Sequence, residues 1–172
     1  MMDSQAALVL RELGENDGPT FLAAVAASRE LHRPWVSPPG DVEAFLALLF
    51  RSRRHDHASY LAWHRRDLVG AVNLNAIVRG RLRSAYLGFY AFSPHAGRGW
   101  MRQALTRGID RAFGVHGLHR LEANVRPDNQ RSRRLLEGLG FRLGGCLELR
   151  VGGERHEHER WVLLADEWAA PE

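Results

Sequence analysis

A glycine-containing stretch in the middle of the chain has the composition of an anion-binding loop. Residues 93–102 read Ser-Pro-His-Ala-Gly-Arg-Gly-Trp-Met-Arg and lie between a predicted strand and a long predicted helix. Residues 95–102 include no Ser, Thr, Asp or Asn that could cap this helix, and its first turn is basic, with Arg98 and Arg102. Helix N-termini favour anions over cations. The stretch therefore predicts a site for phosphate or diphosphate, and a plain glycine turn with solvent-facing arginines is the alternative.

Two other phosphate-binding motifs do not describe this loop. A P-loop ends in Gly-Lys-Ser or Gly-Lys-Thr, and the chain contains no lysine. The dinucleotide fingerprint requires a further glycine after Gly97 and Gly99, and the residue at that position is Arg102. The spacing indicates an anion site without identifying the anion.

A second polar stretch opens the next predicted helix. Residues 124–132 read Asn-Val-Arg-Pro-Asp-Asn-Gln-Arg-Ser. Asp128 and Asn129 are both suited to cap the helix. If Asp128 is the cap, Asn129 is available to a ligand. Ser132 lies in the first turn, where serine is also an ordinary helix residue.

Together, the two stretches resemble the GNAT superfamily of acyl-CoA-dependent N-acetyltransferases. The loop of that family, Gln/Arg-x-x-Gly-x-Gly/Ala, aligns with residues 96–101, which keep the central Gly99 but have Ala96 and Met101 at the outer positions. The Asn-x-x-Ser helix of the family, followed by Leu-Gly-Phe, matches residues 129–141. Pro34-Trp35, Val78-Arg79-Gly80 and Ala85-Tyr86-Leu87-Gly88 resemble the RimJ/RimL branch, which acetylates the N-termini of ribosomal proteins.

The resemblance implies that acetyl-CoA is the cosubstrate and that specific residues bind it. Backbone groups of the fourth strand would pair with the pantetheine arm, and one N–H there would stabilise the thioester oxyanion. The glycine loop would hold the diphosphate, and Arg131, Arg133 or Arg134 would reach the 3′-phosphate or simply coat the helix. The full implied set is Tyr90, Ala91, Phe92, Gly97, Arg98, Gly99, Trp100, Met101, Arg102, Asn129 and Arg134.

The resemblance also implies direct attack of a free amine on the thioester. Ser132 would donate a proton to the departing thiolate, and Trp35 would form part of the acceptor site. The branch places a glutamate where this chain has Val151, so Glu148 is the expected base, with His156 and His158 as substitutes. An α-amino group has a pKa of ~7.7–8.0 against ~10.4 for lysine, so an N-terminal acceptor needs little help from a base.

The elements that must position these residues follow from hydrophobic periodicity and turn signals. The chain predicts strands at 7–12, 59–63, 68–78, 84–92, 121–125, 141–151 and 154–164, and helices at 19–31, after Asp41, at 97–115 and from 127–129 to 138–140. On the helix after Asp41, the expected buried face is Phe45, Leu46, Leu48 and Leu49. Interleaved helices and strands indicate an α/β (α+β) fold with a mixed sheet. The resemblance specifies the GNAT fold, with about seven strands, a splay between strands 4 and 5, and about four helices in one domain over residues 1–172.

Composition sets the outer limits of function. The 172 residues carry a formal net charge of +4, with 45% hydrophobic and 26% charged residues, as in ordinary globular domains. The single cysteine, Cys146, excludes an internal disulfide and favours a reducing, cytoplasmic location, with a buried thiol. We expect no signal peptide or membrane span, because residues 1–5 have no basic segment and no long apolar run follows them. We also expect no metal, because the run His156-Glu157-His158-Glu159 lacks zincin spacing.

The partners expected from the sequence are acetyl-CoA and an amine. The amine is the N-terminus of a protein such as a ribosomal protein, or alternatively a small molecule such as an amino acid, polyamine or antibiotic. A non-catalytic basic module that binds RNA or the ribosome is the third hypothesis, although direct contact with nucleic acid is not expected. A homodimer is compatible with the sequence.

Overall fold

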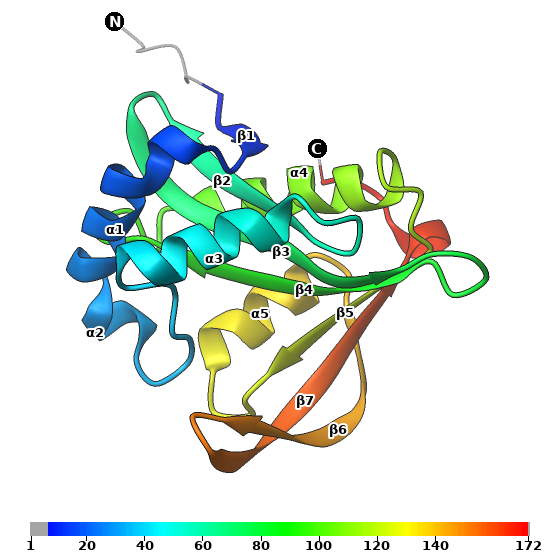
Figure 1. Cartoon of the computed structure of the whole chain (residues 1–172). Coiled ribbons are helices and arrows are strands. Elements are labelled where there is room, and N and C mark those ends of the chain that lie inside the picture. The colour runs from blue at the N-terminus through cyan, green and yellow to red at the C-terminus, as the bar shows by residue number, and fades with distance from the viewer. Residues whose placement is uncertain (1–6, 172) are drawn as a thin grey trace, which may run out of the picture. The chain divides into compact units, whose positions relative to one another are not determined.

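The computed structural model describes residues 7–171, which form one mixed seven-stranded sheet and five α-helices. The strands are β1 (Val9–Glu12), β2 (Ala58–His64), β3 (Asp67–Val78), β4 (Ser84–Ala91), β5 (Arg120–Val125), β6 (Arg142–Val151) and β7 (Glu154–Leu164). The helices are α1 (Gly18–Ala27), α2 (Arg29–His32), α3 (Val42–Ser52), α4 (Trp100–Phe113) and α5 (Gln130–Gly138) (Figure 1). The strand order is β1-β2-β3-β4-β5-β7-β6, which confirms the predicted fold class. None of the described helices is long and apolar enough to cross a membrane.

The chain forms two compact units, each assembled from segments that are distant in sequence. Of the described residues, the first unit comprises residues 7–73 and Phe89–Gly108, and the second comprises Leu74–Gly88 and residues 109–171. Strands β3 and β4 and helix α4 therefore contribute residues to both units.

The first unit is built on an aromatic and aliphatic core beneath α1 and α3. Strand β1 pairs antiparallel with β2, from Val9 opposite Trp63 to Glu12 opposite Tyr60. Helices α1 and α3 contact each other. The ring of Phe21 lies 5.4 Å from that of Phe45 and 5.8 Å from that of Phe92. These buried rings connect both helices to the end of β4, where residues of the predicted cosubstrate site lie.

The predicted helix 19–31 is wrong in one respect, because it is divided into α1 and α2 at Ser28. Ser28 leaves helical geometry, with φ −109° and ψ 10°. Its hydroxyl donates to the Ala24 carbonyl at 2.6 Å and accepts from the Ser93 N–H at 2.9 Å. A serine that bonds to nearby backbone competes with the regular helical hydrogen bonds. The break gives five α-helices instead of about four.

Helix α3 confirms its predicted cap and most of its predicted face. Asp41 accepts a hydrogen bond from the Ala44 N–H at 2.8 Å. Phe45, Leu48 and Leu49 are buried, as expected from their i, i+3, i+4 spacing. The prediction for Leu46 is wrong, since this side chain is 53% exposed. Leu46 lies on the solvent-exposed face of α3 with Val42 and Phe50, because residues four positions apart share one face of a helix.

Helix α4 begins three residues later than predicted and ends at Phe113. Gly97 and Gly99 have φ of +77° and +82°, which is the left-handed region that interrupts a right-handed helix. The two glycines therefore belong to the loop, and the first helical residue is Trp100.

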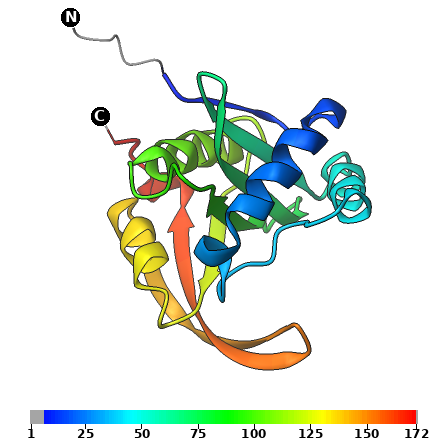
Figure 2. The same cartoon turned by 90° about the vertical axis from the view of Figure 1, so that its left-hand side faces the viewer.

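The second unit consists of a strand ladder with α5 and the end of α4. Within residues 7–171, the parallel β4–β5 ladder comprises three residue pairs, from Ser84 opposite Arg120 to Tyr86 opposite Glu122, and the rest of β5 pairs with β7. Strands β6 and β7 form a long hairpin (Figure 2). The expectation of a buried Cys146 thiol is wrong. Cys146 is exposed because β6 is the edge strand of the sheet and leaves most of its side chains in solvent.

Candidate functional site

The glycine loop of the first unit exposes backbone donors at the start of α4. No atom lies within 4 Å of the position that a side chain would take at Gly97 or Gly99, so the backbone there is open to a ligand. Within residues 7–171, no acceptor of the chain is hydrogen-bonded to the N–H groups of Trp100, Met101 or Arg102. Arg98 and Arg102 are exposed beside these donors. The arrangement fits a diphosphate in donor type, charge and access.

Two large side chains anchor the first turn of α4 to the sheet. The Trp100 ring stacks on His64 of β2, with centroids 4.1 Å apart and planes 25° from parallel. The Met101 sulfur lies over Gly70 of β3, in space that a β-carbon at residue 70 would need. Trp100 and Met101 therefore use their side chains for packing, and their predicted part in binding falls to their N–H groups. Gly70 explains how methionine fits where the family has a small residue.

The end of β4 offers one backbone donor in particular. The Phe92 N–H donates to the Val69 carbonyl at 3.0 Å, and the Phe92 carbonyl accepts from the His95 N–H at 2.9 Å. The backbone groups of Phe92 are thus engaged within the chain. Since N–H groups alternate in direction along a strand, the Ala91 N–H points away from β3. Of the predicted residues 90–92, Ala91 is best suited to bind a carbonyl oxygen.

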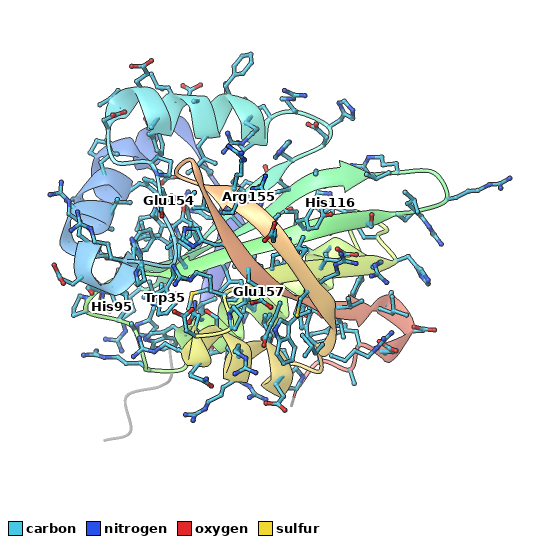
Figure 3. All side chains as sticks on the ribbon, turned by 90° about the horizontal axis from the view of Figure 1, so that it is seen from below. Trp35, His95, His116, Glu154, Arg155 and Glu157 are labelled. Atoms are coloured by element: carbon cyan, nitrogen blue, oxygen red, sulfur yellow. The ribbon has the colours of Figure 1, made fainter. Side chains whose placement is uncertain are left out.

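Tyr90 and Trp35 complete the predicted set in this unit. Burial raises the pKa of Tyr90 to about 12, against a smaller lowering from its hydrogen bond with Asn73, so the phenol stays neutral. Trp35 is partly buried in the turn after α2, where its N–H donates to the His32 carbonyl at 2.7 Å. Figure 3 shows Trp35 in that turn and His95 in the loop after β4.

In the second unit, Asn129 is the cap of α5. Its side-chain oxygen accepts from the Ser132 N–H at 3.2 Å. The alternative in which Asp128 caps the helix is wrong, because Asp128 pairs with Arg126 at 3.0 Å. The Asn129 amide nitrogen can still donate to a ligand. Ser132 lies partly buried in the first turn.

The arginines of α5 divide into one that is paired within the chain and others that are exposed. Arg133 Nε lies 2.8 Å from Glu159 Oε2, and the indole nitrogen of Trp161 donates to the same oxygen at 3.1 Å. Arg133 is therefore not a candidate for the 3′-phosphate. Arg134 is exposed and keeps that predicted role.

The predicted base Glu148 lies on the β6–β7 hairpin. Its side chain is 70% exposed, 3.9 Å from Arg155 Nη1, and it is opposite Glu157 in the ladder. Of the substitutes, His158 is buried, with Nδ1 3.0 Å from the His156 carbonyl oxygen, whereas His156 is about one-third exposed. Figure 3 shows Glu154, Arg155 and Glu157 on this hairpin.

A shallow pocket lies where the β5–α5 loop meets β7. Its volume is about 240 Å³, and its lining residues are Arg126, Pro127, Asp128, His156 and Glu157. Sequence reasoning did not select Arg126 or Glu157, because the pocket depends on a loop and a strand that are thirty residues apart. No three His, Cys, Asp or Glu side chains in residues 7–171 are grouped to hold a metal ion.

Comparison with known proteins identifies the family. Residues 7–142 match the family model of the acetyltransferase (GNAT) domain. The chain belongs to the GNAT acetyltransferase family. As a GNAT protein it is an N-acetyltransferase, and its acetyl donor is acetyl-CoA.

Relatives of this GNAT enzyme act on different amines. It is 27% identical over 94% of its length to the ribosomal protein uS5-alanine N-acetyltransferase of Escherichia coli (strain K12), covering 89% of that protein. It is also 27% identical to the spermidine N(1)-acetyltransferase of Vibrio cholerae, covering 97% of both chains. It is 36% identical to the probable N-acetyltransferase YjcK of Bacillus subtilis (strain 168) over 56% of its own length, and it spans 55% of that relative.

The fold of this GNAT enzyme matches that of a solved RimJ structure. Mycobacterium smegmatis RimJ, in complex with CoA-disulfide, has a TM-score of 0.85 and 29% identity, over 93% of this chain and 83% of RimJ. The resemblance to the RimJ/RimL branch predicted from sequence is confirmed.

Proposed function

We propose that this GNAT enzyme acetylates the N-terminal α-amino group of a protein acceptor. The observation that carries the proposal is similarity over nearly the whole chain to a RimJ structure and to a uS5-alanine N-acetyltransferase. Many GNAT enzymes share the donor, so the acceptor must be inferred from such whole-length similarity and tested directly.

Acetyl-CoA would supply an acetyl group activated as a thioester. The N–H groups of Trp100, Met101 and Arg102 would hold the diphosphate, with Arg98 and Arg102 contributing positive charge. Arg134 would contact the 3′-phosphate, and the Asn129 amide nitrogen would donate to the pantetheine arm. The Ala91 N–H would bind the thioester oxygen, where negative charge develops during attack.

Two proton transfers complete the proposed reaction. The Ser132 hydroxyl would give a proton to the leaving sulfur as the C–S bond breaks. The attacking amine forms the new C–N bond and loses a proton to water or to Glu148. About 10–17% of an α-amine with a pKa of ~7.7–8.0 is neutral near pH 7, a few hundred-fold more than of a lysine amine with a pKa of ~10.4. A base as exposed as Glu148, at 70%, is then sufficient.

A small polyamine is the second candidate acceptor. The spermidine N(1)-acetyltransferase of Vibrio cholerae is 27% identical over 97% of this chain, which is the same identity as that of the uS5-alanine enzyme. Primary amines of polyamines have a higher pKa than an α-amine and would demand more of the base.

The test compares acceptors under one assay of CoA release. The probes are a peptide with a free N-terminal alanine, the same peptide with its N-terminus blocked, and spermidine. We expect turnover of the free peptide only, with the acetyl group located on the α-amine by mass spectrometry. Faster turnover of spermidine would replace the proposed acceptor by the second candidate.

A matched pair of variants tests the chemistry. Ser132→Ala should lower kcat by about 10²-fold, within the range for a general acid, with little change in the affinity for CoA. Arg98→Gln should raise the KM for acetyl-CoA and leave kcat nearly unchanged. If Ser132→Ala retains full kcat, the proton donor is another group or water.

A further inference from the structure

His32 is a buried polar side chain that belongs to none of the predicted contacts. It lies on α2 and is only 4% exposed. Its Nε2 is 2.7 Å from the carbonyl oxygen of Ala91, so Nε2 carries the proton and donates it. Burial lowers the pKa of His32 and so favours the neutral ring, and the hydrogen bond to Ala91 opposes this with a smaller effect. A buried histidine that bonds to the backbone beside the candidate oxyanion donor requires a functional explanation.

The bond from His32 completes a clasp on two consecutive peptide groups. The first consists of the Ala91 carbonyl and the Phe92 N–H, bound by His32 at one end and by Val69 at the other. The second consists of the Phe92 carbonyl, bound by the His95 N–H, and the Ser93 N–H, bound by the Ser28 hydroxyl. Both groups lie directly after the Ala91 N–H. With their orientation fixed at both ends, the dihedral angles that aim this N–H are restricted as well.

The His32 ring is itself held in place. It makes edge contacts with Tyr90 and Phe92, at centroid distances of 5.5 and 5.8 Å. Its backbone carbonyl accepts from the N–H groups of Trp35, at 2.7 Å, and Val36, at 3.0 Å. One residue therefore connects the end of β4 with the turn that carries the proposed acceptor-site residue Trp35.

We infer that His32, assisted by Ser28, is a positioning residue for acetyl transfer, which fixes the Ala91 N–H and the Trp35 turn in their working geometry. The inference rests on the proposed function, because it assigns the Ala91 N–H to the thioester oxygen. Loss of one oxyanion donor costs about 10²–10³-fold in kcat, and a displacement of about 1 Å can cost ~10²-fold. Removal of the clasp should therefore reduce kcat by about 10–100-fold.

The first arm of the experiment uses a spectroscopic signature. Acetyl-CoA labelled with ¹³C at the thioester carbonyl is bound to the wild-type enzyme, and its carbonyl stretch is measured by difference infrared spectroscopy. A hydrogen bond from the Ala91 N–H lowers this frequency. His32→Ala should return it toward the value of free acetyl-CoA, whereas His32→Gln, whose amide can donate to the Ala91 carbonyl, should preserve most of the shift. The same frequency in wild type and His32→Ala would overturn the inference.

The second arm separates positioning from folding by kinetics. With the alanine peptide or spermidine, whichever wild type acetylates, His32→Ala should lower kcat while the Kd for CoA stays within about threefold, a change below ~0.7 kcal/mol. Ser28→Ala should give a smaller loss of kcat. Its matched control is Ser52→Ala, which removes a similar hydroxyl-to-carbonyl bond of 2.7 Å at the end of α3 and should leave kcat unchanged. Equal losses in the two serine variants would contradict the inference.

The outcomes also distinguish the inference from the proposed function. If wild type binds acetyl-CoA and acetylates spermidine only, the proposed acceptor fails and the role of His32 is still decided by the infrared shift. If His32→Ala does not fold, His32→Gln and Ser28→Ala decide the question. The clasp is rejected if folded His32→Gln loses the infrared shift completely and Ser28→Ala keeps the wild-type kcat.

Discussion

Replacement of Gly70 by alanine should destabilise the protein, although the same change in a strand normally stabilises it. Alanine is ordinarily favoured over glycine in a strand interior by about 0.5–1 kcal/mol. At Gly70, a new β-carbon would overlap the Met101 sulfur and lie 3.2 Å from the Tyr90 carbonyl oxygen. Overpacking of this kind costs about 1–3 kcal/mol. The sign of the change in the free energy of unfolding therefore reports whether Met101 occupies the space over Gly70.

The assay is thermal or urea unfolding of a small set of variants. After subtraction of the gain of about 0.5–1 kcal/mol, the net loss is up to about 2.5 kcal/mol, which in a chain of this size corresponds to a fall in Tm of up to roughly 5–10 °C. Gly40→Ala is the matched control, because no atom lies within 4 Å of its would-be β-carbon. It should leave stability unchanged or raise it by about 0.4–1 kcal/mol.

A double-mutant cycle assigns the cost to Met101. Met101→Ala alone leaves a void and should cost about 1–3 kcal/mol, because the side chain is only partly buried. In the double variant Gly70→Ala/Met101→Ala, the new methyl group enters the vacated space, so the two changes should couple by about 1 kcal/mol or more. A Gly70→Ala variant more stable than wild type, or strictly additive effects in the double variant, would refute the proposed packing.

Three further perturbations test separate contacts. Asn129→Ala should lose about 0.5–2 kcal/mol of stability with the α5 cap, whereas Asn129→Asp should keep the cap and raise only the KM for acetyl-CoA, as unfolding and kinetics together would show. Arg133→Met leaves the nearly buried Glu159 carboxylate without its guanidinium and should cost about 1–3 kcal/mol, while Arg134→Met should cost under ~0.5 kcal/mol and weaken acetyl-CoA binding instead. The lowered pKa of His32 means that, below about pH 6.5, the unfolded chain takes up a proton that the folded chain resists. Stability should therefore be complete above that pH and fall as pH falls below it, and His32→Gln should show a flatter dependence of Tm between about pH 7.5 and about pH 5.5.

The sequence was informative where a pattern depends on one element alone. Alternation and turn residues predicted all seven strands within a few residues, and the Asp41 cap needed only its own helix. The predictions for Leu46 and Cys146 failed because burial depends on which layers cover a face. Leu46 lies on the uncovered stripe of α3, and Cys146 lies on an edge strand.

The site was predictable in its backbone and much less so in its side chains. The composition of residues 93–102 indicated exposed N–H groups before the helix, and the structure places such groups at residues 100–102. The start at Trp100 was missed because it depends on the left-handed φ of Gly97 and Gly99. His32 gave no signal in the sequence, since its role arises from a bond to Ala91, fifty-nine residues away.

The departures of this chain from its family pattern bear on packing more than on binding. Every residue except proline carries an N–H, so a loop that binds a diphosphate through its backbone keeps its donors when Met101 replaces glycine or alanine. The replacement changes the size of the side chain that must fit against the sheet. Gly70 of β3 leaves the space that the Met101 side chain occupies. In this chain, Met101 of the loop and Gly70 of β3 are therefore matched in size. It follows that restoring alanine at residue 101 should leave the affinity for acetyl-CoA nearly unchanged while it lowers stability, because the backbone donors remain and only the packing against Gly70 is lost.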